Sequence, residues 1–259
     1  MAPNQPSDPS LHLPRILCLH GGGTNANIFY AQCRILREGL GGIFRLCFAD
    51  APFFSEPGPD VTQVYRHRGP FRRWLRFKRE HGPLDADAIV GAIDAALEAA
   101  IRADDEKGAT GEWVGLLGFS QGAKMCASLL FRQQVQGASN NAPIRFRFAV
   151  LLAGRGPLVS LVPDRVMAPS LVDAAHLGFQ VWVDRRSQEH VLRLPTIHVH
   201  GMQDGGLPLH RAMLEDYCDQ RYARMVQWDG GHRVPVKTKV VKAIVHEIVT
   251  VARESGILV

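Results

Sequence analysis

The segment Gly118-Phe119-Ser120-Gln121-Gly122 constrains the fold of this chain more than any other feature. An apolar run over Trp113–Phe119 precedes the serine, and a helical pattern over Gln121–Gln136 follows it. A G-x-S-x-G pattern between a strand and a helix is typical of a nucleophile elbow, a tight turn that holds a serine at the end of a sheet. The turn also directs the backbone N–H of Gln121 at the space above the hydroxyl. We therefore expect Ser120 to be a nucleophile if the chain supplies a base to activate it.

Two later segments supply a candidate acid and a candidate base. Residues 195–201 are predicted to form a strand, and Asp204 follows its end. A short strand over Met225–Trp228 is followed by Gly230, Gly231 and His232. The order Ser120, Asp204, His232 is the Ser, Asp, His order of α/β-hydrolases. The alternatives are that Asp204 caps the next helix and that His232 is a surface histidine, and Asp229 is a second candidate acid.

A glycine-rich turn follows the first predicted strand, Arg15 to His20. Gly21, Gly22 and Gly23 can present backbone N–H groups to a developing oxyanion. The alternatives are a plain turn and a phosphate loop, but the segment contains neither the Gly-Lys-Ser/Thr signature of a phosphate loop nor G-x-G-x-x-G. All of these candidate groups lie at the carboxyl ends of predicted strands, where open α/β sheets bind ligands.

His198 and His200 lie on the same face of a predicted strand, and together with Asp204 and His232 they raise the alternative of a metal site. No H-E-x-x-H motif or cysteine pair supports it. We expect His198 to pack or hydrogen-bond within the sheet and His200 to help position the loop that follows, with no metal and no cofactor. The five cysteines are scattered and odd in number, which indicates free buried thiols and a cytoplasmic location. Residues 1–14 lack the pattern of a signal peptide, and no apolar run approaches the ~18 residues of a membrane span.

Strands alternate with helices along the chain, which predicts an α/β fold with a mainly parallel central sheet and helices on both faces. We expect a flexible segment over 1–14 and a single domain over 15–259. A cap-like insertion at about 51–83, rich in proline, arginine and aromatic residues, and an irregular segment over 154–193 interrupt the alternation. The remaining predicted helices are 27–38, one capped by Asp85, 209–222 and 235–255, and the remaining predicted strands are 43–49 and 146–153.

Over nearly its whole length the chain resembles the fungal "family of serine hydrolases" type of α/β-hydrolase. The matching segments are Ile16 to Gly21, Ala51-Pro52-Phe53 with Gly58-Pro59, Gly69-Pro70 with Trp74, Gly118 to Ala123, Leu194 to Gly201 with Asp204, and Gly230-Gly231-His232 with Pro235. Within that family it is similar to lovastatin-pathway-like thioesterases and esterases of secondary metabolism. The resemblance implies a catalytic triad of Ser120, Asp204 and His232. It also implies an oxyanion hole of Gly22 and Gln121, because His20 to Gly23 fit the family's H-G-x-G.

These features predict a serine hydrolase that cleaves an acyl thioester or carboxylic ester through an acyl-enzyme. A general short-chain carboxylesterase is the alternative within this class, and a non-catalytic binding scaffold is the alternative from another class. We expect aromatic side chains of the cap to form an apolar wall over Ser120, as is typical of small-molecule pockets. These residues are Phe53, Phe54, Tyr65, Phe71 and Trp74.

Residues 65–79 carry seven basic side chains beside the expected entrance of the site. They are Arg66, Arg68, Arg72, Arg73, Arg76, Lys78 and Arg79. The first interpretation is a solvated face with internal carboxylate partners. The second is a docking surface for an acidic acyl carrier protein of a polyketide synthase, which would act through encounter rate and orientation. Nucleic acid is excluded as a partner, because no binding motif accompanies the charge.

Overall fold

Parallel strands form the central sheet of the computed structural model, which describes residues 8–59, 61–137, 144–162, 168–177, 183–184 and 186–259. Within these residues the sheet has six strands in the order β2-β1-β5-β6-β7-β8, and every neighbouring pair is parallel. In chain order they are β1 (Arg15–Leu19), β2 (Arg45–Ala49), β5 (Trp113–Phe119), β6 (Phe148–Leu152), β7 (Thr196–Gly201) and β8 (Ala223–Trp228). The predicted parallel sheet is therefore confirmed.

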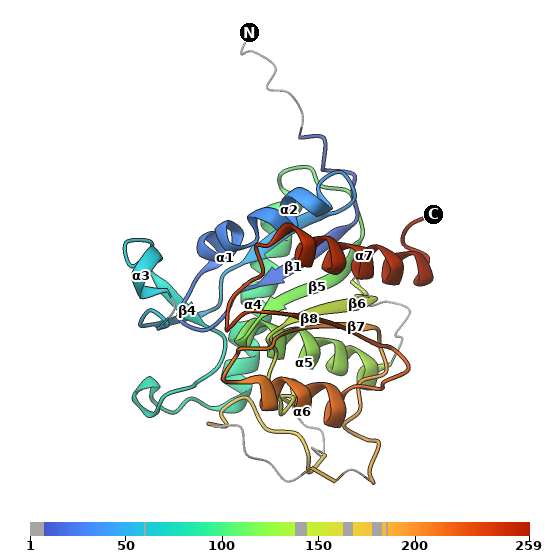
Figure 1. Cartoon of the computed structure of the whole chain (residues 1–259). Coiled ribbons are helices and arrows are strands. Elements are labelled where there is room, and N and C mark those ends of the chain that lie inside the picture. The colour runs from blue at the N-terminus through green and yellow to red at the C-terminus, as the bar shows by residue number, and fades with distance from the viewer. Residues whose placement is uncertain (1–7, 60, 138–143, 163–167, 178–182, 185) are drawn as a thin grey trace.

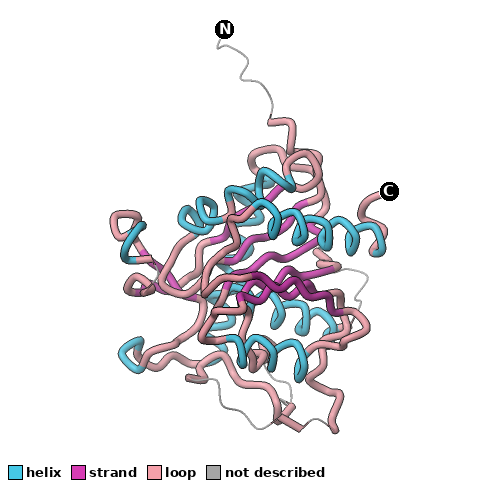
Figure 2. The backbone as a smooth tube through the Cα atoms, in the orientation of Figure 1, coloured by secondary structure: helices cyan, strands magenta, loops and turns pink. Residues whose placement is uncertain are grey.

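Helices cover both faces of this sheet (Figures 1 and 2). On one face lie α1 (Ala26–Gln32), α2 (Arg34–Leu40) and α7 (Thr238–Glu254), and on the other lie α4 (Ala86–Asp105), α5 (Gln121–Gln136) and α6 (Leu207–Tyr217). Alternate strand residues face the two layers: Leu151 packs with the α4–α6 layer, whereas Val150 and Leu152 pack with the other. This double burial explains the nearly continuous apolar runs of the strands. None of the described helices has the length and apolarity needed to cross a membrane.

The predicted helix over 27–38 is two helices, because the chain turns at Cys33, which ends α1 and precedes α2. Helix α6 ends at Tyr217 rather than at residue 222, since Cys218 adopts an extended conformation and the N–H of Asp219 donates to the carbonyl of Leu192. The side chain of Asp85 accepts from two backbone N–H groups of α4, which confirms its predicted role as the N-cap.

The cap segment over 51–83 contains more regular structure than its composition predicts. Strands β3 (Phe53–Ser55) and β4 (Phe71–Arg73) form an antiparallel pair, α3 (Thr62–Tyr65) lies between them, and a short 3₁₀ turn, η1, spans Arg79–His81. Backbone hydrogen bonds join this cap to the glycine-rich turn after β1. The N–H of Gly23 donates to the carbonyl of Arg72 at 2.9 Å, and the N–H of Gly58 donates to the carbonyl of Gly23 at 2.9 Å.

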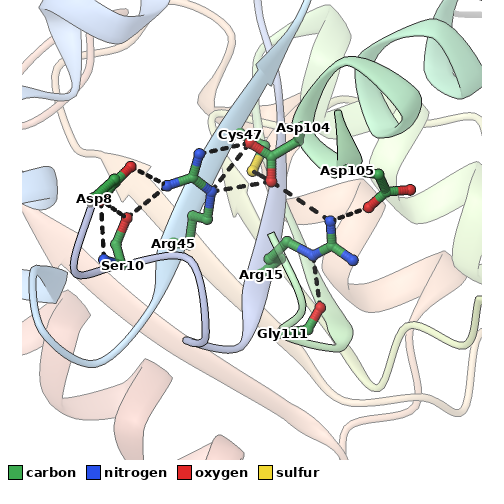
Figure 3. A network of polar contacts seen from close by, with 8 residues as sticks. All are labelled: Asp8, Ser10, Arg15, Arg45, Cys47, Asp104, Asp105 and Gly111. Carbon is green, nitrogen blue, oxygen red and sulfur yellow. Dashed lines mark hydrogen bonds and ion pairs between the residues drawn. The ribbon is translucent and has the colours of Figure 1, made fainter. Parts of the chain in front are cut away.

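Arg15 and Arg45 are the first residues of β1 and β2. They bind the end of α4 at the amino ends of these strands (Figure 3), whereas the glycine-rich turn follows the carboxyl end of β1. The Nε and Nη2 atoms of Arg45 lie 3.0 and 2.7 Å from Asp104 Oδ1, and Arg15 lies 3.5 Å from Asp104 Oδ2. Arg45 also binds Asp8 at 2.6 Å. Asp8 thus contacts the start of β2, whereas the first seven residues of the expected N-terminal segment lie outside the described part of the chain.

Candidate active site

The turn at Ser120 has the geometry that the sequence pattern predicts. Its φ of 53° is in the left-handed region, which a non-glycine residue rarely adopts. The flanking glycines permit close backbone contact: a Cβ on Gly118 would lie 2.4 Å from the backbone of Gly122, and one on Gly122 would lie 2.0 Å from the carbonyl oxygen of Leu19. The N–H of Ser120 donates to the carbonyl of Leu152 at 2.8 Å, which fixes the turn to the end of β6.

Ser120, His232 and Asp204 form a continuous hydrogen-bonded chain. His232 Nε2 lies 3.0 Å from Ser120 Oγ, and His232 Nδ1 lies 2.6 Å from Asp204 Oδ2. A carboxylate can only accept, so Nδ1 carries the hydrogen and Nε2 presents its lone pair to the serine hydroxyl. The three residues follow the ends of β5, β7 and β8, and these parallel strands end at the same edge of the sheet.

Asp204 is almost completely buried, with 1% of its side chain exposed. Burial alone would raise the pKa of this carboxyl, but hydrogen bonds from the N–H of Gly206 and from His232 outweigh it and hold the pKa below its ordinary value. Arg155 lies 3.9 Å from Asp204 Oδ1. The guanidinium of Arg155 also packs against Gly206, where a Cβ would lie 2.6 Å from Arg155 Nη2.

The glycine-rich turn is held by His20, which is completely buried. His20 Nε2 accepts from the N–H of Ala51 at 3.0 Å, so Nδ1 carries the hydrogen and donates to the carbonyl of Gly21 at 2.7 Å. Burial lowers the pKa of His20 to about 4, which keeps the ring neutral at physiological pH. The indole N–H of Trp74 donates to the carbonyl of His20 at 3.0 Å. The ring and the cap therefore fix the turn that contains Gly22.

Gly22 and Gln121 lie together beside Ser120, and all three line one cavity. A Cβ on Gly22 would lie 3.4 Å from Gln121 Oε1. The side chain of Gln121 joins the elbow to the cap: its Oε1 accepts from the N–H groups of Trp74 and Leu75 at 2.7 and 3.2 Å, and its Nε2 donates to the carbonyl of Leu75 at 3.0 Å. Its backbone N–H lies at the first position of α5, next to Ser120.

The cavity has a volume of about 1020 Å³ and contains all three residues of the hydrogen-bonded chain in its lining. Of the five aromatic residues expected in its wall, Tyr65 alone lines it among the described residues. Trp74 is completely buried below the turn, and Phe54 is 67% exposed under the guanidinium of Arg72. Phe53 and Phe71 belong to the β3–β4 pair and also lie outside the lining. The apolar lining residues are instead Val61, Val64, Leu75, Phe77, Phe119, Val159, Val172, Leu177, Leu209, Val234 and Val236.

The basic run over 66–79 does not form one uniform face. Arg72 donates to the carbonyl of Ala51, and Arg73 is buried and donates to the carbonyl of His81. Lys78 pairs with Glu56 at 3.2 Å, and Arg76 lines the cavity. Arg66, Arg68 and Arg79 are exposed, as is Lys78 in its ion pair.

Four histidines extend from the sheet to the cavity, with ring centroids 5.9, 5.7 and 6.1 Å apart along His198, His200, His210 and His232. His198 is buried in β7, as expected, and its Nε2 lies 3.2 Å from Thr196 Oγ1. His200 is buried in the same strand, and burial lowers the pKa values of His198 and His200 to about 3 and about 4. Asp204, His210 and His232 offer ligand atoms within 4.8 Å of one another, so these three could hold a metal ion. The hydrogen bonds of Asp204 to His232 and Gly206 account for its geometry without one.

Three residues of the site have no part in the sequence-based predictions. His210 on α6 is completely buried, with its Nε2 3.7 Å from Asp204 Oδ2, but a lone histidine in a helix gives no signal. Lys124 is a charged residue in an otherwise apolar stretch of α5, and that interruption is a usable signal. Arg155 follows the end of β6, and a basic residue at the carboxyl end of a parallel strand is also a usable signal.

The family model described as "Serine hydrolase (FSH1)" matches residues 10–244. Among curated proteins, "Esterase pigG" of Monascus ruber is 58% identical over 100% of this chain and 98% of its own. "Probable esterase tazC" of Aspergillus terreus is 52% identical over 97% of each chain. "Esterase citA" of Monascus ruber is 51% identical over 96% of each chain.

Solved structures share the fold at low identity. The crystal structure of Arabidopsis thaliana SOBER1 covers 92% of this chain and 98% of its own, with a TM-score of 0.51 and 18% identity. A carboxylesterase from Mesorhizobium loti covers 91% and 88%, with a TM-score of 0.52 and 16% identity. These likenesses confirm the α/β-hydrolase architecture.

Proposed function

Because the chain belongs to the Serine hydrolase (FSH1) family, we propose that it cleaves an acyl thioester or carboxylic ester through a triad of Ser120, His232 and Asp204. Membership of this family confirms the resemblance noted in the motifs and the expectation of an esterase-type enzyme. We take residues 15–259 as one hydrolase domain with the cap inserted at about 51–83, a proposal that the family match over 10–244 supports.

In the proposed reaction, Ser120 Oγ attacks the acyl carbonyl while His232 Nε2 accepts the hydroxyl proton. The bond to the leaving sulfur or oxygen then breaks, and the imidazolium returns the proton to that atom. Asp204 orients the ring and stabilises its charged form. A water molecule next gives a proton to His232 and its oxygen to the acyl carbon, and the proton returns to Ser120 as the acid is released. The observation that supports this proposal most directly is the hydrogen-bonded chain with distances of 2.6 and 3.0 Å.

We assign the oxyanion hole to the backbone N–H groups of Gly22 and Gln121. Both residues line the cavity with Ser120, and hydrogen bonds of His20 and Trp74 fix the turn that contains Gly22. Fixed donors require no reorganisation as charge develops on the carbonyl oxygen, and one such donor typically contributes about 10²–10³ in rate.

Labelling with a fluorophosphonate probe tests the nucleophile. The wild-type enzyme should form a covalent adduct on Ser120, and the Ser120→Ala variant should fold normally, remain unlabelled and show no turnover. A labelled Ser120→Ala protein would place the nucleophile elsewhere. Absence of labelling in well-folded wild-type protein would favour the non-catalytic scaffold.

We assign the physiological substrate to the acyl thioesters and esters of fungal polyketide and secondary metabolism, in the cytoplasm. The fungal origin of the esterases named above and the large cavity support this assignment. The five cysteines are free and buried, as is usual in a reducing compartment. A short-chain carboxylesterase is the alternative. A series of thioesters and oxygen esters from acetyl to dodecanoyl distinguishes the two, because this alternative requires kcat/KM to fall steadily from the acetyl ester.

We further propose that an acidic acyl carrier protein docks on the exposed part of the basic run. Arg66, Arg68 and Arg79 supply this surface, whereas Arg72 and Arg73 are bound within the cap. Replacing the three exposed arginines with Ala should slow turnover of a carrier-bound acyl thioester and spare the N-acetylcysteamine thioester of the same acyl group. The preference for the carrier-bound substrate should shrink as salt rises. Equal losses on both substrates would exclude the docking role.

A further inference from the structure

The cavity beside Ser120 carries an excess of positive charge. Its described lining contains five basic and two acidic side chains: Arg34, Arg76, Lys124, Arg155 and Arg233 against Asp173 and Asp204. Asp204 is already bound by His232 and Gly206. A cleft with low-dielectric walls and one sign of charge focuses its field and concentrates ions of the opposite sign. The cavity should therefore favour anionic groups over neutral ones.

Lys124 is the most deeply placed of these cations. It lies one turn after the nucleophile, since its N–H donates to the carbonyl of Ser120 at 3.1 Å. The side chain is buried, with only 7% of the residue exposed, but it lines the cavity. Burial lowers the pKa of Lys124 to about 8, so the ammonium is still largely protonated at pH 7. Lys124 is part of the cavity wall, where an ammonium group can donate hydrogen bonds to an anionic substrate group.

Arg76 belongs to the cap and lines the same cavity. It follows Leu75, whose N–H and carbonyl are both bound by the side chain of Gln121. Lys124 is three residues beyond Gln121 and therefore lies on the neighbouring position of the same helix face. The Nε of Arg76 is buried and has no hydrogen-bond partner among the described residues. A donor in that state, in the wall of a cavity, is suited to an acceptor on a ligand.

Arg155 also lines the cavity. The preceding Gly154 packs on the start of α5, where a Cβ would lie 3.1 Å from the Cβ of Ala123. The lining also contains apolar residues, including Val61, Val64 and Phe77 of the cap. A substrate with a carbon chain and an anionic end could contact residues of both kinds at once.

We propose that Lys124 and Arg76, with Arg155 beside them, form a binding subsite for an anionic oxygen group of the substrate. This inference rests on the proposed hydrolysis at Ser120 and specifies its substrate class. The group is a carboxylate or enolate oxygen of the acyl chain, or a phosphate of the thiol carrier. All three present oxygens that accept hydrogen bonds from ammonium and guanidinium groups.

Two pairs of substrates test the subsite and separate these sources. The first pair is p-nitrophenyl hemiglutarate and its uncharged methyl ester, compared by nitrophenol release. The second pair is the butyryl thioester of 4′-phosphopantetheine and that of pantetheine, which differ only in the phosphate. In the wild type, one pair should show a higher kcat/KM for the anionic member. Lys124→Met and Arg76→Met should each reduce that preference about tenfold, as expected for loss of a charge-assisted hydrogen bond.

The matched control is Lys242→Met, which removes one positive charge from an exposed position on α7 outside the cavity lining. It should leave both preferences unchanged. A change in the glutarate pair assigns the subsite to the acyl chain, and a change in the thioester pair assigns it to the carrier. No preference in either pair, or equal effects of all three variants, overturns the proposal. Labelling of Ser120 by fluorophosphonate in each variant keeps this result separate from failure of the hydrolase mechanism, and Arg76→Met retains the test if Lys124→Met folds poorly.

Discussion

The carboxylate of Asp204 uses its two oxygens for different donors: Oδ1 accepts from the N–H of Gly206 and Oδ2 faces His232. Asp204→Asn would present an amide that can donate to His232 and favour the wrong tautomer. We expect kcat to fall about 10⁴-fold with little change in fold. Asp229→Asn is the matched control, because Asp229 binds the side chain of Gln203 at 2.6 Å rather than the triad. Steady-state kinetics should show near-normal rates for the control, and the reverse pattern would reassign the acid to Asp229.

Lys124 should destabilise the protein at neutral pH. Its pKa is lowered by burial from 10.5 to about 8, which corresponds to about 3 kcal/mol against the charged form. That penalty is complete below pH 8, decreases as the folded state releases its proton between pH 8 and 10.5, and is absent above this range. Lys124→Met should thus unfold at higher denaturant concentration than wild type at pH 7, with a difference that shrinks by pH 10. A constant difference across this range would show that burial of charge is not its cause.

Chelation tests the other chemistry open to Asp204, His210 and His232. Because hydrogen bonds account for the geometry of Asp204, we expect full activity after exhaustive treatment with EDTA or 1,10-phenanthroline and removal of the chelator. Loss of activity that added Zn²⁺ restores would identify these residues as a metal centre.

At the scale of the elements, the side chain of Gln121 connects α5 to the cap. Gln121→Ala would remove three hydrogen bonds and leave the N–H groups of Trp74 and Leu75 without that acceptor. We expect a loss of about 1–3 kcal/mol in stability and faster proteolysis within the cap. Gln133→Ala is the matched control. Gln133 lies later in α5, and its side chain makes two similar hydrogen bonds to the backbone of Phe146. It should lose stability without exposing the cap, and equal cleavage in both variants would contradict a specific clamp.

The sequence predicts elements well where one local pattern determines the structure. The strand, turn and helix around Ser120 follow from close backbone contacts that exclude side chains at Gly118 and Gly122. The cap is harder to predict, because its strands are only three residues long and depend on pairing with distant residues. Trp74 illustrates the difficulty. Its aromatic side chain is of the type that suits a pocket wall, but its indole N–H donates to the buried carbonyl of His20, a contact that only the folded chain reveals.

On the scale of the molecule, the two ends of the parallel strands differ in the residues that they hold together. The candidate site lies at the carboxyl ends of the strands, whereas the network of Arg15, Arg45 and Asp104 lies at the other end (Figure 3). Burial would raise the pKa of Asp104, but its hydrogen bonds to Arg45 and Cys47 outweigh it and hold the pKa below 3.8. The stability that this pairing contributes is therefore complete above the ordinary pKa and is lost as pH falls through the lowered one.

Asp104→Asn should reduce the free energy of unfolding by about 3 kcal/mol and leave kcat/KM unchanged, since it breaks a buried ion pair far from the nucleophile. The matched control is Asp105→Asn, whose carboxylate pairs with Arg15 but is half exposed, and it should change stability by less than about 1 kcal/mol. Chemical denaturation and steady-state kinetics measure both effects. A fall in kcat/KM for Asp104→Asn at full folding would show that the two ends are coupled.

The backbone bonds of Gly23 to the cap have a consequence for how this enzyme can be modified. Arg72 and Gly58 hold the same turn that contains Gly22, so a cap that swings away from the sheet would pull that turn with it. The cap therefore cannot rotate away from the sheet as a rigid body without displacing the turn beside Ser120. Chimeras that graft the cap of one relative onto another should exchange residues 20–25 together with residues 51–83, because backbone hydrogen bonds join the two segments into one structural unit.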